Sequence, residues 1–228
     1  MRNLIGLIVV AVGAICAAVA HASTISTPLT TGVMNAFGTP NTQTYGQTIT
    51  TPADHFLQSF SFYMDLPAAL AFQGEVYAWD GSEAAGSALY ENAPVSTAGA
   101  GMQQITFNVG GANLIAGRQY VLFASSSKLA NGGNLQGPWG ISSTNYTGGN
   151  FVFINSGTTP SLWTSTPWFQ ISLPNNGDLA FTAEFSPTAN VVPLPRSEWS
   201  GLILLGGVGL ARGLGRRAQS SLQVTERD

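Results

Sequence analysis

The chain is poor in the side chains from which most catalytic and metal centres are built. Its 228 residues include one cysteine and two histidines. Cys16 and His21 both lie within the first 22 residues, so the rest of the chain has a single histidine, His55, and no thiol. This composition excludes a disulfide framework and a cysteine nucleophile from that part of the chain. It also leaves too few cysteine and histidine ligands for the usual zinc sites, so we predict no metal centre of that kind.

A serine-histidine-aspartate relay is not indicated either. Asp54 directly precedes His55, and neighbouring side chains on a strand point to opposite faces. The sequence also lacks the G-x-S-x-G pattern that marks a nucleophilic serine in one large class of hydrolases. We therefore interpret His55 as a structural or surface residue and predict no catalytic residues.

Charge is scarce as well. Charged residues make up 8% of the chain, and between residues 23 and 190 eight acidic residues face only Arg118 and Lys128. A negative surface repels phosphate backbones, so we expect no nucleic-acid partner. Serine, threonine, asparagine, glutamine and glycine replace the missing charges. A neutral polar surface of this composition is compatible with contact to sugars.

The N-terminus carries the pattern of an export signal. Arg2 is followed by an apolar run over residues 4–19 and then by Ala20, His21 and Ala22. This is the order of charged region, apolar region and small-residue cleavage site in a secretory signal peptide. A membrane anchor needs roughly 20 apolar residues and usually more flanking charge. We predict a signal peptide over residues 1–22, removed by signal peptidase, and a mature chain that starts near Ser23.

The C-terminal segment, residues 191–228, carries a second signal. It contains a proline-flanked motif, a short apolar run and an arginine cluster, in that order: Val192, Pro193, Leu194 and Pro195; residues 199–211; and Arg212, Arg216 and Arg217. This order resembles the sorting signal of the PEP-CTERM family, in a variant with Leu194 where the commonest form has glutamate. The resemblance implies recognition by an exosortase-like enzyme in the envelope of a Gram-negative bacterium.

The same resemblance implies that the C-terminal apolar helix anchors the protein in the membrane before processing. Arginine resists translocation, so the cluster would stay on the cytoplasmic side while the preceding domain faces outward. The alternative is a glycine-rich tail that is not processed, because glycines weaken a helix in water by about 1 kcal/mol each.

Residues 23–190 show the period-two alternation of β-strands. Leu179, Phe181, Ala183 and Phe185 share one face of a strand. We predict strands at residues 59–64, 74–79, 103–109, 119–125, 151–155, 168–172 and 179–185, with weaker signals at 47–51 and 88–91. One short helix is expected, near residues 67–71. Short strands separated by turns indicate an all-β fold, a single β-sandwich domain of jelly-roll type between the two terminal signals.

One local motif supports a sandwich. Gly117 precedes Tyr120 by three positions, at the start of a predicted strand. This spacing is typical of a tyrosine corner, in which a tyrosine hydroxyl ties an inter-strand loop to its own backbone. We therefore interpret Tyr120 as structural.

Large aromatic residues are the best candidates for a binding site. Aromatic faces stack on the apolar faces of sugars while neighbouring polar groups bond the hydroxyls. The sequence suggests a polysaccharide-binding set that consists of Tyr77, Trp79, Trp139, Tyr146 and Trp163, with Trp168 as a further large aromatic. Trp139, Tyr146 and Trp163 lie in segments rich in small polar residues, which favours exposure on loops. The alternative, ordinary core packing, stays open for each of them.

Two other kinds of site stay open. Glu75 would share a strand face with Tyr77 and Trp79 and could supply one of the two carboxylates that glycoside hydrolysis needs. Residues 80–83, Asp-Gly-Ser-Glu, could bind Ca²⁺, although a plain turn is the simpler interpretation. We therefore expect an exported, non-enzymatic surface or extracellular-matrix protein, adhesive or structural, with exopolysaccharide as its suggested ligand. The alternative is a small secreted polysaccharide-degrading enzyme.

Overall fold

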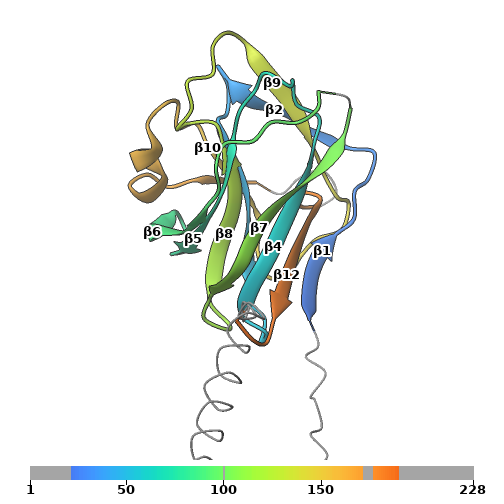
Figure 1. The fold of residues 1–228 in the computed structure, drawn as a ribbon, viewed down its shortest axis with the longest axis vertical. Coiled ribbons are helices and arrows are strands. Elements are labelled where there is room, and N and C mark those ends of the chain that lie inside the picture. The colour runs from blue at the N-terminus through green and yellow to red at the C-terminus, as the bar shows by residue number, and fades with distance from the viewer. Residues whose placement is uncertain (1–21, 100, 172–176, 190–228) are drawn as a thin grey trace, which may run out of the picture. The chain divides into compact units, whose positions relative to one another are not determined.

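The computed structural model describes residues 22–99, 101–171 and 177–189 (Figure 1). The chain divides into two units, Met1–Ala189 and Asn190–Asp228, and every described residue belongs to the first. The predicted signal peptide, apart from Ala22, and the predicted sorting segment therefore lie outside the described residues. Within the described ranges, no helix is long and apolar enough to cross a membrane.

Two six-stranded antiparallel sheets form the described unit. Sheet A has the order β1-β12-β4-β9-β2, and β7 also pairs with β4. Its strands are β1 (Ser23–Thr27), β2 (Val33–Thr39), β4 (Phe56–Met64), β7 (Gln103–Asn113), β9 (Leu135–Gly140) and β12 (Phe181–Ser186). Sheet B has the order β11-β10-β3-β8-β5-β6. Its strands are β3 (Thr44–Thr50), β5 (Gln73–Trp79), β6 (Ala84–Glu91), β8 (Gln119–Ser125), β10 (Phe151–Ile154) and β11 (Phe169–Gln170).

The all-β prediction is confirmed, and each strand predicted from the sequence has a counterpart in one of the two sheets. The sequence did not indicate β1, β2 and β9. β1 is short and polar, and β9 contains glycine and proline, which are rare in strands. The short helix expected near residues 67–71 is wrong. Leu70 N donates to Pro67 O across a simple turn at this place.

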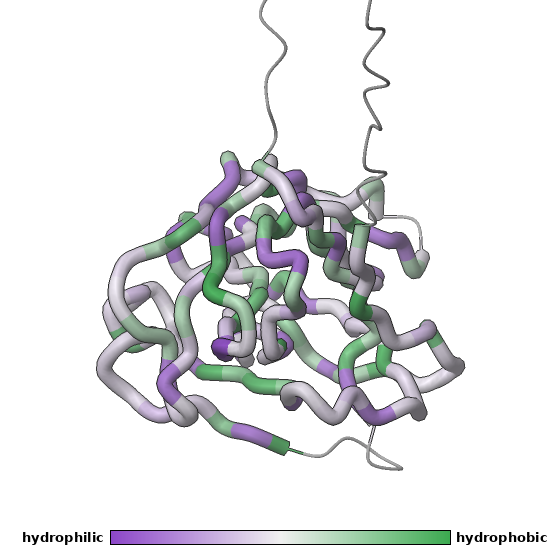
Figure 2. The backbone as a smooth tube through the Cα atoms, turned by 90° about the horizontal axis from the view of Figure 1, so that it is seen from below, coloured by the Kyte–Doolittle hydropathy of each residue, from purple (hydrophilic) through white to green (hydrophobic). Residues whose placement is uncertain are grey.

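Alternation along the strands builds the core between the sheets. Phe60 and Phe62 of β4 and Phe181 and Phe185 of β12 point inward, and each is fully buried. Figure 2 shows that apolar and polar residues are interleaved along the backbone, as expected for strands with one buried face, such as β7 and β12. The core therefore depends on alternation within strands, as the sequence pattern predicted.

A second apolar layer covers the other face of sheet B. The connection from β10 to β11 contains the 3₁₀ helix η1 (Pro160–Thr164) and crosses this outer face. Trp163 and Trp168 from this connection pack on Phe123 of β8, with ring centroids 5.0 and 5.3 Å apart. The central strands β3, β5 and β8 are therefore buried on both faces, which explains why β8 reads as a nearly continuous apolar run.

The tyrosine corner is present. The hydroxyl of Tyr120 accepts a hydrogen bond from the backbone N–H of Ile115, at 2.9 Å, and Tyr120 is buried. Gly117 adopts a positive φ of 77° in the same turn, a backbone conformation that glycine accepts at no steric cost. The structural interpretation of Tyr120 is confirmed.

The first and last strands of the sandwich are neighbours. β1 and β12 are antiparallel, and Ser23 lies opposite Phe185. Both chain ends therefore leave sheet A at the same end of these two strands, which Figure 1 shows at the lower end of the view. The connections from β4 to β5 and from β8 to β9 lie at the opposite end. There β4 ends at Met64, β5 begins at Gln73 and β8 ends at Ser125.

Candidate ligand-binding site

The structure places the predicted aromatic set mostly in the interior. Trp139 is 0% exposed and packs between Phe37, Tyr45 and Phe62, with ring centroids 5.1, 5.5 and 4.9 Å away. The expected loop exposure of Trp139 is wrong, because it belongs to β9 and alternation turns it into the core. Because aromatic side chains surround the indole of Trp139, it has no free face on which a sugar could stack.

Trp163 is also buried, at 1% exposure, and its indole N–H lies 3.2 Å from each of two hydroxyls, Thr44 Oγ1 and Ser156 Oγ. Tyr77 and Trp79 share its layer: Tyr77 lies edge-on to Trp163, and Trp79 lies edge-on to Trp168. All of these rings are buried. The polar neighbours Ser161, Thr164 and Ser165 are exposed, whereas Trp163 between them turns inward onto sheet B.

Tyr146 is half-buried and is tied to the backbone of β3. Its hydroxyl accepts from Thr50 N at 3.2 Å and donates to Thr50 O at 3.3 Å. Its own N–H donates to Asp178 Oδ2 at 2.7 Å. These bonds hold the connection between β9 and β10 against sheet B, so Tyr146 acts in the structure as a loop anchor.

Glu75 shares a sheet face with Tyr77 and Trp79, as the alternation predicted, but the second layer covers that face. The Glu75 side chain is 0% exposed, and the ammonium of Lys128 lies 2.9 Å from its Oε1. The same ammonium lies 2.7 Å from Glu91 Oε2 and 5.0 Å from the centre of the Trp163 ring. Burial raises the pKa of Glu75 to about 7, against the opposing effect of Lys128.

The other acidic and histidine residues singled out by the sequence have local roles. Asp80 Oδ1 accepts from the N–H groups of Ser82 and Glu83, at 2.7 and 2.8 Å, so residues 80–83 form a turn closed by the carboxylate itself. These bonds hold the pKa of Asp80 below its usual value. His55 Nδ1 lies 3.0 Å from Ala53 O. In the described part of the chain, no group of three or more His, Cys, Asp or Glu is placed to hold a metal ion.

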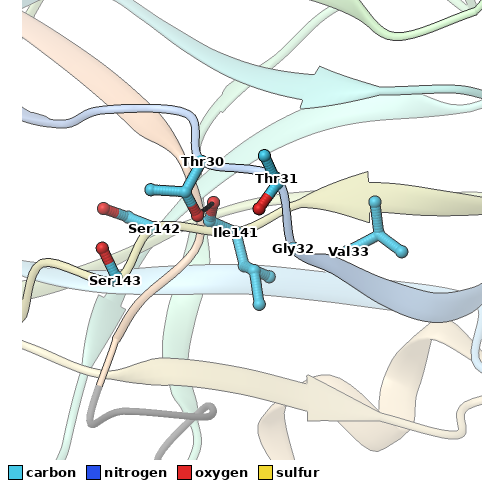
Figure 3. Close-up of a pocket in the computed structure, with 7 residues that line it drawn as sticks. All are labelled: Thr30, Thr31, Gly32, Val33, Ile141, Ser142 and Ser143. Atoms are coloured by element: carbon cyan, nitrogen blue, oxygen red, sulfur yellow. Dashed lines mark hydrogen bonds between the residues drawn. The ribbon is translucent and has the colours of Figure 1, made fainter.

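An open pocket of about 350 Å³ lies between two connections on sheet A (Figure 3). One wall is the segment that enters β2, and the facing wall is the segment that leaves β9. The lining residues are Thr30, Thr31, Gly32, Val33, Ile141, Ser142 and Ser143. None of these side chains is ionisable, and four of the seven carry a hydroxyl group. We call this the hydroxyl pocket.

Backbone and side-chain bonds fix the two walls of the hydroxyl pocket against each other. The N–H and the hydroxyl of Thr30 both donate to Ile141 O, at 3.0 and 2.8 Å, and Ile141 N donates to Gly32 O at 3.2 Å. A Cβ at Gly32 would come within 2.7 Å of the Ile141 side chain, so a larger residue would push the walls apart. The positions of the two walls relative to each other are therefore fixed by the fold itself.

The chemistry of the hydroxyl pocket suits an uncharged polyol. Thr31 and Ser143 are exposed and can each donate and accept hydrogen bonds. Ile141 is nearly buried, while Val33 is exposed and provides apolar surface at the rim. These residues carry no signal in the sequence, because serine and threonine are abundant throughout the chain and no spacing distinguishes them.

Comparison with known proteins does not identify a family. No family model matches the chain, and no curated protein matches it. One similar solved structure contains the cysteine protease and lectin-like domains of Cwp84, a surface layer associated protein of Clostridium difficile. The similarity covers 65% of this chain and 32% of that chain, at 11% identity and a TM-score of 0.45. The chain thus spans about a third of the length of that protein.

Proposed function

We propose that this chain is an exported, non-enzymatic β-sandwich of jelly-roll type that binds neutral polysaccharide and has an adhesive or structural role at the cell surface or in the extracellular matrix. The observation that carries the binding proposal is the hydroxyl pocket, which is open, fixed and free of ionisable side chains. Such a lining favours a ligand whose own hydrogen-bonding groups are hydroxyls, because a charged ligand would lose hydration without gaining a partner.

The sorting proposal rests on where the strands begin and end. β1 starts at Ser23, directly after the predicted signal-peptidase site, and β12 ends at Ser186, before the predicted sorting motif. Removal of residues 1–22 and of the segment after Pro195 would therefore leave both sheets complete. This arrangement is what a domain needs if signal peptidase and an exosortase-like enzyme act on its two ends.

Intact-mass measurement tests the sorting proposal. We expect protein released from the producer to have a mass that starts at Ser23 and ends near Pro195, and membrane-bound protein to retain the tail. A released form that runs to Asp228 would contradict processing at the Val192-Pro193-Leu194-Pro195 motif.

Affinity electrophoresis tests the binding proposal. The full chain should be retarded in a native gel that contains exopolysaccharide from its producer, and the double variant Thr31→Ala, Ser143→Ala should be retarded less. Migration of the intact, folded chain at the same rate with and without polysaccharide would overturn the proposal.

Polysaccharide cleavage is a second candidate, favoured by one observation. Glu75 and Glu91 contact the same ammonium, and the pKa of Glu75 is raised to about 7, which suits a general acid. Two features weigh against cleavage, because Lys128 lies between the two carboxylates and Glu75 is closed to solvent. Release of reducing ends that is lost in Glu75→Gln would favour the enzyme.

A further inference from the structure

The position of Phe169 follows from that of Trp168. Trp168 is buried in the second apolar layer, and its indole N–H donates to Trp163 O at 2.9 Å. The following residue, Phe169, begins β11, where side chains alternate between faces. Phe169 therefore points to the opposite face of sheet B, at the edge strand, and is 56% exposed.

The ring of Phe169 is held in place by other rings. It stacks on Phe153 with centroids 5.0 Å apart and planes at 18°, and Phe153 stacks on Phe151 at 5.8 Å and 22°. Phe151 is buried and also contacts Tyr45 edge-on. The series of three nearly parallel rings runs from the core to the surface, and its last ring has one face covered by Phe153.

Phe169 differs from the other exposed apolar residues. In the described ranges, the remaining large apolar side chains with high exposure are aliphatic: Leu29, Val33, Leu89, Ile115 and Ile171. A flat ring that is fixed from one side loses little conformational freedom when a ligand covers the other side. Gln170 points to the other face, where its Nε2 donates to Gly81 O, and the exposed neighbour Ile171 is uncharged, so the surroundings favour an uncharged partner.

We propose that Phe169 is a stacking platform for the apolar face of a neutral pyranose unit, and thus a polysaccharide contact distinct from the hydroxyl pocket. This inference rests on the proposed function. The C–H groups on one face of a pyranose ring pack against the face of an aromatic ring, and β11 is an edge strand that a polymer can reach from the side. A strand from a second copy is a weaker candidate occupant, because β11 has only two residues, fewer than the three to ten of ordinary strands.

The test compares Phe169 with a residue of equal exposure. Ile115, in the connection from β7 to β8, is 57% exposed and serves as the matched control. The full chain, Phe169→Ala, Phe169→Trp and Ile115→Ala are run in native gels that contain hydroxyethylcellulose, mannan, the producer's exopolysaccharide or the polyanion alginate. We expect Phe169→Ala to weaken binding to a neutral polymer about tenfold, the gain typical of a well-placed aromatic contact. Phe169→Trp should retain binding, and Ile115→Ala should match the wild type.

Each outcome separates this inference from the proposed function. If the wild type is retarded by a neutral polymer and Phe169→Ala is retarded equally, the platform is overturned while polysaccharide binding stands. If the wild type is not retarded in any neutral gel, the proposed function fails and the platform fails with it. Retardation in alginate alone would also overturn the neutral-sugar assignment. If Phe169→Ala turns a dimer into a monomer in size-exclusion chromatography without changing retardation, the surface is a self-association site and the inference is wrong.

Discussion

At the scale of single residues, Glu75 carries a carboxyl group where ionisation is costly. Its pKa is raised from 4.5 to about 7 in the folded chain, mainly by burial. The folded state therefore holds the proton more tightly than the unfolded state does. The stabilisation from this group is fully present below pH 4.5 and is lost as the pH rises through about 7.

Replacement of Glu75 should remove this pH dependence. Between pH 4.5 and 8, ionisation of Glu75 should lower the free energy of unfolding of the wild type by about 3 kcal/mol. Glu75→Gln cannot ionise, so in urea unfolding at pH 8 it should be more stable than the wild type by up to that amount. Glu83→Gln, which removes a carboxylate without a contact to Lys128, should follow the wild type. Parallel pH profiles for the wild type and Glu75→Gln would contradict the argument.

Trp163 offers a test of structural against ligand-binding use. Trp163→Ala should lower the free energy of unfolding by about 3–5 kcal/mol, because it opens a cavity under the second layer. Trp163→Phe keeps most of the volume and loses the indole bonds to Thr44 and Ser156, so a smaller loss is expected. Thermal unfolding measures both. If Trp163→Phe keeps the stability of the wild type but no longer binds polysaccharide, Trp163 has a role in ligand binding.

At the scale of elements, the connection from β7 to β8 depends on the hydroxyl of Tyr120. Tyr120→Phe leaves the N–H of Ile115 without its partner and should destabilise the fold by about 1 kcal/mol. Tyr63→Phe is the control, because Tyr63 is only half-buried. Denaturant midpoints measured side by side should move for Tyr120→Phe and not for Tyr63→Phe. Equal midpoints would mean that water replaces the hydroxyl at no cost.

Elements with strong alternation were predictable, and the layer that covers them was not. β4 and β12 could be read from their phenylalanines, and the shared face of Glu75, Tyr77 and Trp79 followed from β5 alone. The sequence could not show that the connection from β10 to β11 folds back over that face. The contact joins Trp163 to Tyr77 and Phe123, which are far from it in the sequence. The burial of Trp163 under this layer therefore has no local signal, and the burial of Trp139 depends on β9, a strand that the sequence does not indicate.

The candidate site was less predictable than the sheets. The hydroxyl pocket joins residues near 30 with residues near 141, and no local pattern relates two such segments. The sequence does not single out Phe169, because a phenylalanine in a β-rich run is ordinarily a core residue. Its exposure depends on Trp168 being drawn to the other face, and on β11 lying at the edge of sheet B.

At the scale of the whole molecule, the described domain should be independent of the tail. Within the described ranges, the core clusters and both sheets are built from residues between Ser23 and Ser186. A chain that stops after Ala189 should therefore have the same free energy of unfolding in urea as the full chain, within about 1 kcal/mol. We expect this truncated chain to accumulate in the medium, whereas the full chain is first found with the membrane. Unfolding at a clearly lower urea concentration would show that the tail packs on the domain.

The neighbouring positions of β1, β12 and β4 also determine how the domain bears mechanical load. β12 lies between the other two strands, and its last residues lead toward the tail. A pull on the end of β12 acts along the strand. The hydrogen bonds that join β12 to β1 and to β4 are then loaded in shear, all at the same time. An edge strand peeled from the side would release them one after another. If the tail is the point of attachment, tension from the medium enters the sandwich through an interior strand, and the time for which the domain survives under load is set by its unfolding rate.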